Sequence, residues 1–257
     1  MVINLGKYEI IFWSFIIVLP VIMAKILIHY YSLEFLSVNP LFTSTMAGVI
    51  FIIGILLAGT MSDYKEAEKI PSELRAGIEN ILDEARMFHL VNKDFSLCKV
   101  EIKIKEIISK FLAGLSKEEE HSNLEPCLSS IDELSQSFFE MDRLGIAANY
   151  LVRLKTEQGN LRKMVLRVYH IQKTKFIPSV YILATSLIFF IIFFLLFLKT
   201  EGSPESLLLM GFISYLLLYI IKLICVIETP FRKGHKSMDD VSLFLLGNLI
   251  KKHNKFL

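Results

Sequence analysis

Apolar runs with few charges alternate with one long polar segment along this chain. The apolar runs lie at about residues 10–30, 41–61, 177–198 and 207–227, and residues 62–175 are rich in charged side chains. A helix of about 20 apolar residues crosses a hydrocarbon core of about 30 Å, whereas a long charged segment cannot lie in lipid. The pattern therefore predicts four membrane-spanning helices, in two pairs, with a polar region between the pairs.

The polar segment has a helical periodicity of its own. Apolar residues recur every three or four positions from Leu74 to Leu82 and from Val100 to Leu115, and helices are also predicted from Cys127 towards Arg143 and over residues 147–172. Pro71 suits the first turn of a helix, so a helix is expected to start there.

The predicted fold class is all-α. Residues 1–61 hold the first two transmembrane helices, residues 62–175 a large cytosolic helical region, residues 176–227 the third and fourth transmembrane helices, and residues 228–257 a cytosolic tail.

The distribution of charge predicts the orientation in the membrane. The loop at residues 32–40 has Glu34 as its only charge, whereas Lys and Arg are frequent in the polar segment and after the fourth span. Cytoplasmic loops carry an excess of Lys and Arg. We therefore expect a multi-pass protein of the cell (plasma or inner) membrane, with the first loop outside and both termini in the cytosol.

Composition and the lack of certain motifs exclude several classes of function. Hydrophobic residues make up 53% of the 257 residues, and the formal net charge of +2 gives no reason to expect nucleic acid as a partner. The three cysteines have no metal-like spacing, which indicates reduced thiols. The sequence also contains no phosphate-binding glycine loop and no nucleophile motif. We therefore expect no enzyme, no cofactor and no metal.

The second span carries the most informative stripe of residues. Ala47, Phe51 and Ile55 are spaced four apart, so they lie above one another on one face of a helix. Small residues that let helix backbones approach closely interrupt the same run at Gly48, Gly54 and Gly59. Two interpretations are open. The glycines pack a neighbouring helix while Phe51 faces lipid or core, or several copies surround an axis and the stripe forms an apolar constriction.

Basic residues suggest two further sites. Lys25 and His29 share a face at the end of the first span, where they would form a basic ring at the outer mouth of a symmetric oligomer, although a lysine at such a position more often extends to the headgroups. The helix over residues 147–172 is also basic, which fits either a cytosolic anion vestibule or contact with anionic lipid. The acidic run Glu118 to Glu120 is interpreted as a solvated turn.

Several short motifs resemble, in order, those of the bestrophin family. Phe51-x-x-Gly54-Ile55 followed by Glu68-Lys69-Ile70-Pro71 is similar to the family's F-x-x-G-F followed by E-N-L-P. Residues 177–181 are similar to an I-P-L-V-Y segment, residues 219–231 to an F-Y-x-x-W-L-K … I-N-P-F run, and residues 240–243 to a V-S-L segment, while the middle region matches only loosely. The motif positions are Pro71, Pro178, Tyr181, Pro230 and Phe231.

The resemblance implies a pentameric anion channel whose second spans line a central pore. Its hydrophobic neck would fall on Ala47, Phe51 and Ile55, and a cytosolic aperture near Asn149, by spacing from Glu157 and Leu161. The implied partners are chloride, bromide and iodide, the lipid bilayer and further copies of the chain. An apolar neck favours anions that lose water easily, so we expect permeability to fall from iodide to bromide to chloride.

The chain also departs from the family's pattern. Animal bestrophins follow N-P-F-G with an acidic run that helps to bind calcium, whereas Pro230-Phe231 is followed here by Arg232, Lys233 and Lys236. Basic side chains cannot supply the oxygen ligands that calcium requires, so we expect no calcium gating. The family's tryptophan cluster after the pore helix is missing too, which points to a distant, prokaryote-like branch.

A second class of function remains open on the sequence. A membrane-anchored helical scaffold or sensor would use the cytosolic region to bind a partner and the spans to form oligomers. The number of subunits distinguishes the two, because a scaffold needs no five-fold ring with Phe51 on its axis.

Overall fold

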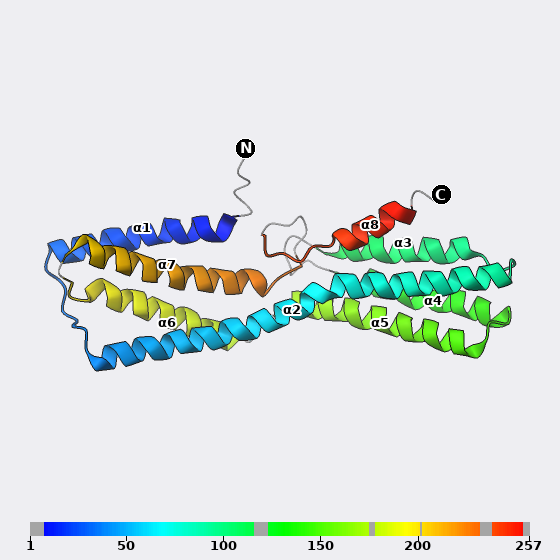
Figure 1. Ribbon diagram of the computed structural model, residues 1–257, viewed down its shortest axis with the longest axis horizontal. Helices are drawn as coiled ribbons and strands as arrows, with labels where there is room; N and C mark the ends of the chain where they lie inside the picture. Colours follow the sequence, from blue (N-terminus) through cyan, green and yellow to red (C-terminus); the bar gives the residue numbers. More distant parts are fainter. Residues whose placement is uncertain (1–7, 116–122, 175–177, 201, 232–237, 254–257) are drawn as a thin grey trace. The chain divides into compact units, whose positions relative to one another are not determined.

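The computed structural model describes residues 8–115, 123–174, 178–200, 202–231 and 238–253, and its elements are helices (Figure 1). Their bounds are α1 Glu9–Tyr30, α2 Pro40–Val91, α3 Leu97–Gly114, α4 Glu125–Arg143, α5 Ala148–Lys173, α6 Pro178–Phe197, α7 Pro204–Ile227 and α8 Phe244–His253. In the described ranges the only β-type pairing is an isolated parallel bridge between Leu36 and Leu198. The predicted all-α fold class is confirmed.

The chain divides into two compact units. One, called here the membrane unit, comprises residues 1–64, 175–228 and 236–239, and the other, the polar unit, comprises residues 65–174, 229–235 and 240–257. Helix α2 contributes residues to both. The sequence-based boundaries at residues 61/62 and 175/176 lie close to these divisions.

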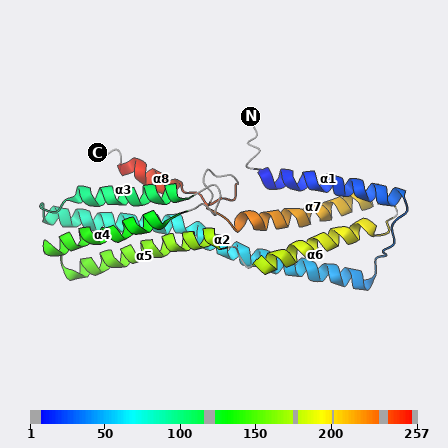
Figure 2. The ribbon, with the colours of Figure 1, turned by 180° about the vertical axis from the view of Figure 1, so that it is seen from behind.

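The membrane unit is a bundle of α1, the first part of α2, α6 and α7 (Figure 2). Its core lies between α2, α6 and α7, and α1 packs against α7 and α6. The buried core residues are Val49, Ile53, Leu56, Ala184, Ile188, Ile191, Leu195, Met210, Leu217, Ile221 and Ile224. Ile10–Tyr30, α2 and α7 are long and apolar enough to cross a membrane, and Tyr181–Phe197 is a shorter apolar helix. This unit also has large apolar side chains on its outer surface. Both features indicate that the chain is a membrane protein.

Several serine and threonine hydroxyl groups in the membrane helices bond within their own helix. Ser14 donates to the Ile10 carbonyl at 2.8 Å, Thr60 to that of Leu56 at 2.8 Å, and Thr185 to that of Tyr181 at 2.9 Å. Because each acceptor lies one turn back on the same helix, these polar groups need no partner from a neighbouring helix.

The polar unit packs the apolar stripes of amphipathic helices together. Helix α4 contacts both α3 and α5, and α8 contacts α3. Buried positions recur at helical spacing, as in Ile104, Ile108 and Phe111 of α3. Gly145 has a φ of +86°, a conformation that favours glycine and ends α4 before α5 begins.

The expectation that a helix begins at Pro71 is wrong, because α2 continues through it. Seven buried residues on the polar-unit part of α2 keep an unbroken spacing of three and four across the proline: Ala67, Pro71, Leu74, Ile78, Ile81, Ala85 and Phe88. Proline inside a helix costs about 3 kcal/mol, but burial of each large apolar side chain contributes about 1.5–3 kcal/mol. The continuous buried stripe therefore outweighs the local preference of proline.

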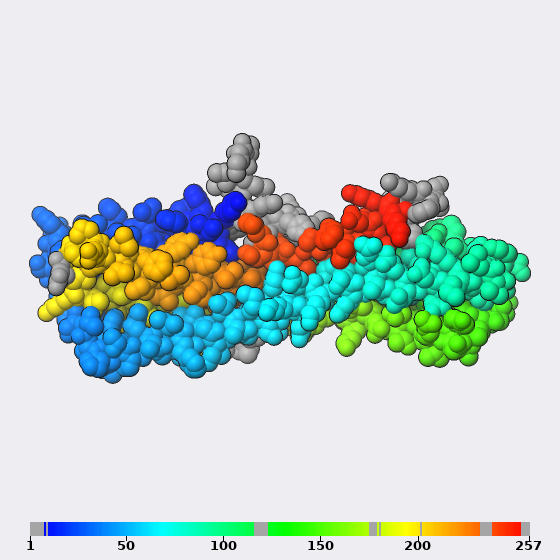
Figure 3. Space-filling model, in the orientation of Figure 1, coloured from blue at the N-terminus to red at the C-terminus, as the bar shows by residue number. Residues whose placement is uncertain are grey.

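The predicted C-terminal tail contains a helix that the sequence reading missed. Helix α8 buries Leu246 and Leu249, and the backbone N–H of Val241 donates to the Pro230 carbonyl at 2.8 Å. In Figure 3, α8 (red) lies on the surface of the polar unit. Residues 240–253 are thus part of a folded unit.

Candidate functional site

Helix α2 presents two contrasting faces in the membrane unit. Val49, Ile53 and Leu56 are at most 6% exposed, because they pack into the core with α6 and α7. Phe51 and Ile55 are 68% and 58% exposed, and Ala47 is exposed as well. The stripe that the sequence singled out therefore lies on the face of α2 turned away from its own subunit.

The glycines of α2 do not pack against other helices of the same subunit at two of the three predicted positions. A Cβ atom built on Gly48 or Gly54 would meet no atom within 4 Å, and both residues are exposed. Gly59 is half-buried. Close packing of these glycines against a neighbouring helix stays a prediction.

Asn39 sets the start of α2. Its side-chain oxygen accepts a hydrogen bond from the backbone N–H of Phe42 at 2.8 Å, and Pro40 is the first residue of the helix. This is the arrangement by which Asn caps a helix and proline occupies its first turn. Asn39 and Pro40 therefore determine where the helix begins.

The structure does not support Lys25 as a member of an outer basic ring. Its side chain is 1% exposed, its Nζ lies 2.6 Å from Glu34 Oε1, and it donates to the carbonyls of Leu196 at 3.2 Å and Leu198 at 2.5 Å. A buried ammonium with a carboxylate partner neither lines a mouth nor reaches the headgroups. His29 remains 46% exposed, with Nδ1 3.3 Å from Glu34 Oε1, and its place in such a ring is still a prediction.

Glu34 is the functional candidate that sequence reasoning missed. It accepts hydrogen bonds from the Thr200 backbone N–H at 3.1 Å and from the Thr200 hydroxyl at 3.2 Å, in addition to its contact with Lys25. Burial would raise the pKa of Glu34, but hydrogen bonds from Lys25, Thr200 and His29 outweigh it and lower the pKa to about 2. Glu34 therefore stays ionised at neutral pH.

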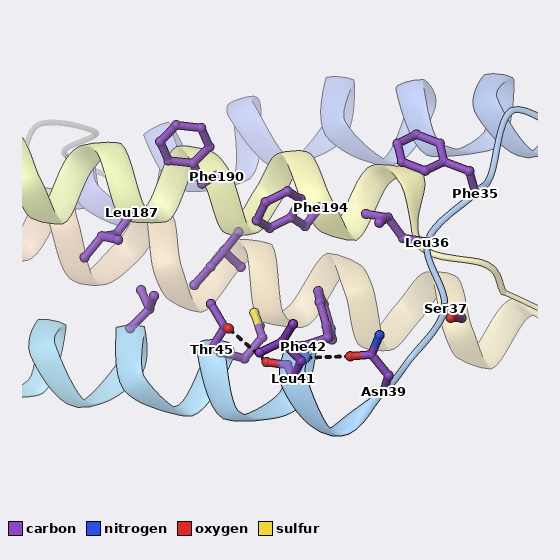
Figure 4. Close-up of a pocket in the computed structure, with 13 residues that line it drawn as sticks. Phe35, Leu36, Ser37, Asn39, Leu41, Phe42, Thr45, Leu187, Phe190 and Phe194 are labelled. Carbon is purple, nitrogen blue, oxygen red and sulfur yellow. Dashed lines mark hydrogen bonds between the residues drawn. The ribbon is translucent and has the colours of Figure 1, made fainter.

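A mostly apolar hollow of about 610 Å³ lies beside the first turns of α2 (Figure 4). Phe190 and Phe194 form its α6 wall, and Leu41, Phe42 and Thr45 belong to its α2 wall. The Thr45 hydroxyl donates to the Leu41 carbonyl at 2.8 Å, so it does not offer its proton to the hollow.

The basic residues of α5 are largely neutralised inside the polar unit. Arg153 lies 2.9 Å from Glu84, Arg167 lies 3.0 Å from Glu66, and Arg162 pairs with Asp132. A groove of about 850 Å³ between α2 and α5 contains charges of both signs. The excess of basic residues in α5 thus gives no argument of its own for an anion vestibule or a lipid contact. Asn149, the second residue of α5, is exposed, and its role in an aperture stays a prediction.

The fold matches solved membrane-protein structures over almost the whole chain. A crystal structure described as a membrane protein superposes with a TM-score of 0.78 at 15% sequence identity, covering 97% of each chain. A bacterial bestrophin homologue from Klebsiella pneumoniae superposes with a TM-score of 0.76 at 16% identity, covering 95% of this chain and 96% of the homologue. The chain has the bestrophin fold. A point mutant of that homologue gives the same TM-score at 15% identity. Neither a family model nor a curated protein sequence matches the chain.

The motif positions shared with bestrophins are parts of the packing. Tyr181 of α6 accepts a hydrogen bond on its hydroxyl from Cys225 Sγ of α7 at 3.1 Å. Pro230 and Phe231 are buried in the polar unit, where the Phe231 carbonyl accepts a hydrogen bond from the Gln172 side chain at 3.0 Å. Helix α6 begins at Pro178. Tyr181, Pro230 and Phe231 thus take part in contacts within the two units and lie outside the exposed stripe on α2.

Two sequence-based expectations concern residues beyond those that the structure describes. They are the acidic run Glu118 to Glu120 and the basic residues Arg232, Lys233 and Lys236, on which the expectation of no calcium gating rests. Among the described residues, no group of three or more His, Cys, Asp or Glu side chains is arranged to hold a metal ion.

Proposed function

We propose that this protein is the subunit of an anion-selective channel of the chloride type, in which five copies surround a central pore. Conduction is passive. The neck of the pore is formed by Ala47, Phe51 and Ile55 of α2, the permeant partners are chloride, bromide and iodide, and calcium does not gate the pore. The proposal assigns no enzymatic activity to the chain.

The observation that carries the proposal is the outward-facing apolar stripe on α2. A large aromatic side chain at 68% exposure, on a helix whose opposite face is buried, is available to line a pore once copies assemble. The bestrophin fold supports the same assignment, because the resemblance in sequence suggests that the family's neck would fall on these residues. An exposed apolar stripe of this kind would also suit contact with lipid or with a neighbouring copy of the chain.

The chemistry of the stripe accounts for selection among anions. An ion that passes an apolar ring loses part of its hydration shell, so the ions that dehydrate at least cost pass most easily. The positively polarised edges of a Phe51 ring attract anions weakly. Permeability is therefore expected to fall from iodide to bromide to chloride.

The proposal includes the orientation of the chain. Four spans per subunit place both termini and the polar unit in the cytosol of a plasma or inner membrane, and the connection at residues 31–39 outside. The excess of Lys and Arg in the polar segment and after the fourth span supports this orientation.

Ion currents through purified protein in planar bilayers test the proposal. We expect reversal potentials in mixed salts to follow the anion gradient, and Phe51→Ala to change the conductance and weaken the discrimination among halides. Ile50→Ala is the matched control, because Ile50 is also exposed, at 54%, but lies about 100° away on α2. Currents carried mainly by sodium or potassium, or equal effects of the two variants, would contradict the proposal.

The number of subunits tests the alternative of a membrane-anchored scaffold or sensor. Mass measurement of the intact complex in detergent is expected to give five copies. A monomer or dimer that passes no ions would favour the scaffold.

A further inference from the structure

The ion pair between Lys25 and Glu34 connects three segments of the membrane unit. Lys25 belongs to α1, Glu34 to the connection that precedes α2, and the groups that complete the cluster belong to residues 196–200 at the end of α6. The Lys25 side chain is 1% exposed and that of Glu34 is 9% exposed, so the pair is largely shielded from water by its own subunit. Each charge is therefore stabilised by the opposite charge and by hydrogen bonds with residues 196–200.

Backbone hydrogen bonds extend this cluster towards α2. The N–H groups of Phe35 and Leu36 donate to the Phe197 carbonyl at 3.2 and 3.1 Å, and the N–H of Lys199 donates to the Leu36 carbonyl at 2.7 Å. The rings of Phe35 and Phe197 also contact each other, with centroids 5.3 Å apart. The connection is therefore attached to the end of α6 as far as Leu36.

Only a short stretch separates this attachment from the candidate neck. Ser37 and Val38 alone lie between Leu36 and the helix cap Asn39, and Ala47 follows eight residues later, about 12 Å along the helix. A shift of the attachment point would move the first turns of α2, because a capped helix moves as a unit.

A buried ion pair is a costly way to hold helices together. Two charges removed from water lose more hydration energy than they recover unless the geometry is good, and apolar residues of similar size would often serve stability as well. In some proteins such a pair instead fixes a directional arrangement that apolar contacts do not enforce.

We propose that Lys25, Glu34 and Thr200 form an outer clamp that positions the start of α2 and thereby sets the width of the neck. This inference rests on the proposed channel function. Glu34 and Lys25 are positioning residues, because they act through α2 and do not touch the permeant ion.

The test compares three variants in three independent measurements. Glu34→Gln leaves Lys25 without a counter-charge, Glu34→Asp keeps the charge, and the double variant Lys25→Met with Glu34→Leu replaces both charges with apolar side chains. Each is measured for its melting temperature in detergent and for halide current and selectivity per folded oligomer in planar bilayers. Spin labels at Leu41 of α2 and Leu208 of α7, both more than 70% exposed, report the position of α2 independently of ion flow. They are placed in a background without Cys98 and Cys225 and diluted with unlabelled subunits.

The double variant decides between a positioning and a merely structural role. We expect it to melt closer to the wild type than Glu34→Gln does, yet to show a broader label-to-label distance distribution and altered halide discrimination. Glu34→Asp should retain the wild-type distance and most of the current. A double variant with wild-type current, selectivity and distances would overturn the clamp.

Failure of the channel function is distinguishable from failure of the clamp. If the wild type passes no anions, the proposed function fails, and the label distances still show whether the pair positions α2. If Glu34→Gln does not fold, the double variant and Glu34→Asp provide the comparison.

Discussion

The two units of this protein use charge in opposite ways. In the membrane unit, the ion pair between Lys25 and Glu34 has side chains that are 1% and 9% exposed, and it lies among apolar helices. The polar unit carries many ion pairs at its surface, such as Lys99 with Glu140 and Arg162 with Asp132. The difference teaches that the number of ion pairs is a poor guide to what holds a unit together. A shielded pair can fix the geometry of a helix start, as proposed for Lys25 and Glu34, whereas exposed pairs add little to stability.

Loss of the charge on Glu34 tests the first half of this comparison and should have the largest effect. Glu34→Gln leaves the Lys25 ammonium buried without a negative partner, and breaking a buried pair from one side costs about 3–5 kcal/mol. The melting temperature of the purified protein measures the loss. A change no larger than that of a surface pair would show that water reaches Lys25 in solution.

A substitution that creates a cavity in the polar unit should have the next largest effect on stability. Leu161 is fully buried and packs close to Gly77 of α2. Leu161→Ala removes apolar contacts and is expected to cost about 2–5 kcal/mol. Denaturant unfolding of the full chain, followed by a probe in α5, measures it. If Leu161→Ala were as mild as the loss of an exposed ion pair, the view that apolar stripes hold this unit would be wrong.

Acid should weaken the membrane unit within a defined range of pH. The pKa of Glu34 falls from an ordinary 4.5 to about 2 in the folded protein, so its stabilising contribution is complete above pH 4.5 and is lost as pH falls towards 2. We expect the melting temperature to decline over that range by less in Glu34→Gln than in the wild type. Equal declines would mean that other carboxylates dominate.

Removal of an exposed pair in the polar unit should have the smallest effect. Asp132→Asn takes the partner from Arg162, and both side chains are more than 40% exposed. We expect a loss of about 0.2–1 kcal/mol, reduced further by salt. A loss comparable to that of Glu34→Gln would remove the contrast between the two units.

Local patterns in the sequence predicted most of the helices but not the path of α2. The helices at residues 97–114, 125–143 and 148–173 follow from periodic apolar residues within each segment. Pro71 misled the interpretation, because its local preference was opposed by a stripe buried against residues far away in the sequence. The tail helix α8 was missed for a related reason, since it is short and its apolar residues acquire meaning only against α3.

Only part of the candidate site could be predicted from the sequence, because local patterns reveal a stripe on one helix but not contacts between distant segments. The exposed stripe of Ala47, Phe51 and Ile55 was visible as a spacing on one helix, and its place on a neck remains a proposal. The partnership of Glu34 with Thr200 spans 166 positions, which no local pattern reveals. One signal was available, because Lys25 is a lone cation in an apolar span and Glu34 is the lone anion in the loop after it, and charges of this kind usually pair.

The hydroxyl groups that bond within their own helices affect how the spans insert into the membrane during synthesis. A span that satisfies its own polar groups can enter the bilayer as soon as it is synthesised, without waiting for its neighbours. The first span also carries the charged Lys25, whose counter-charge follows only nine residues later. We expect the two charges to meet while the ribosome is still making the second span, long before the carbonyls of Leu196 and Leu198 exist to complete the cluster.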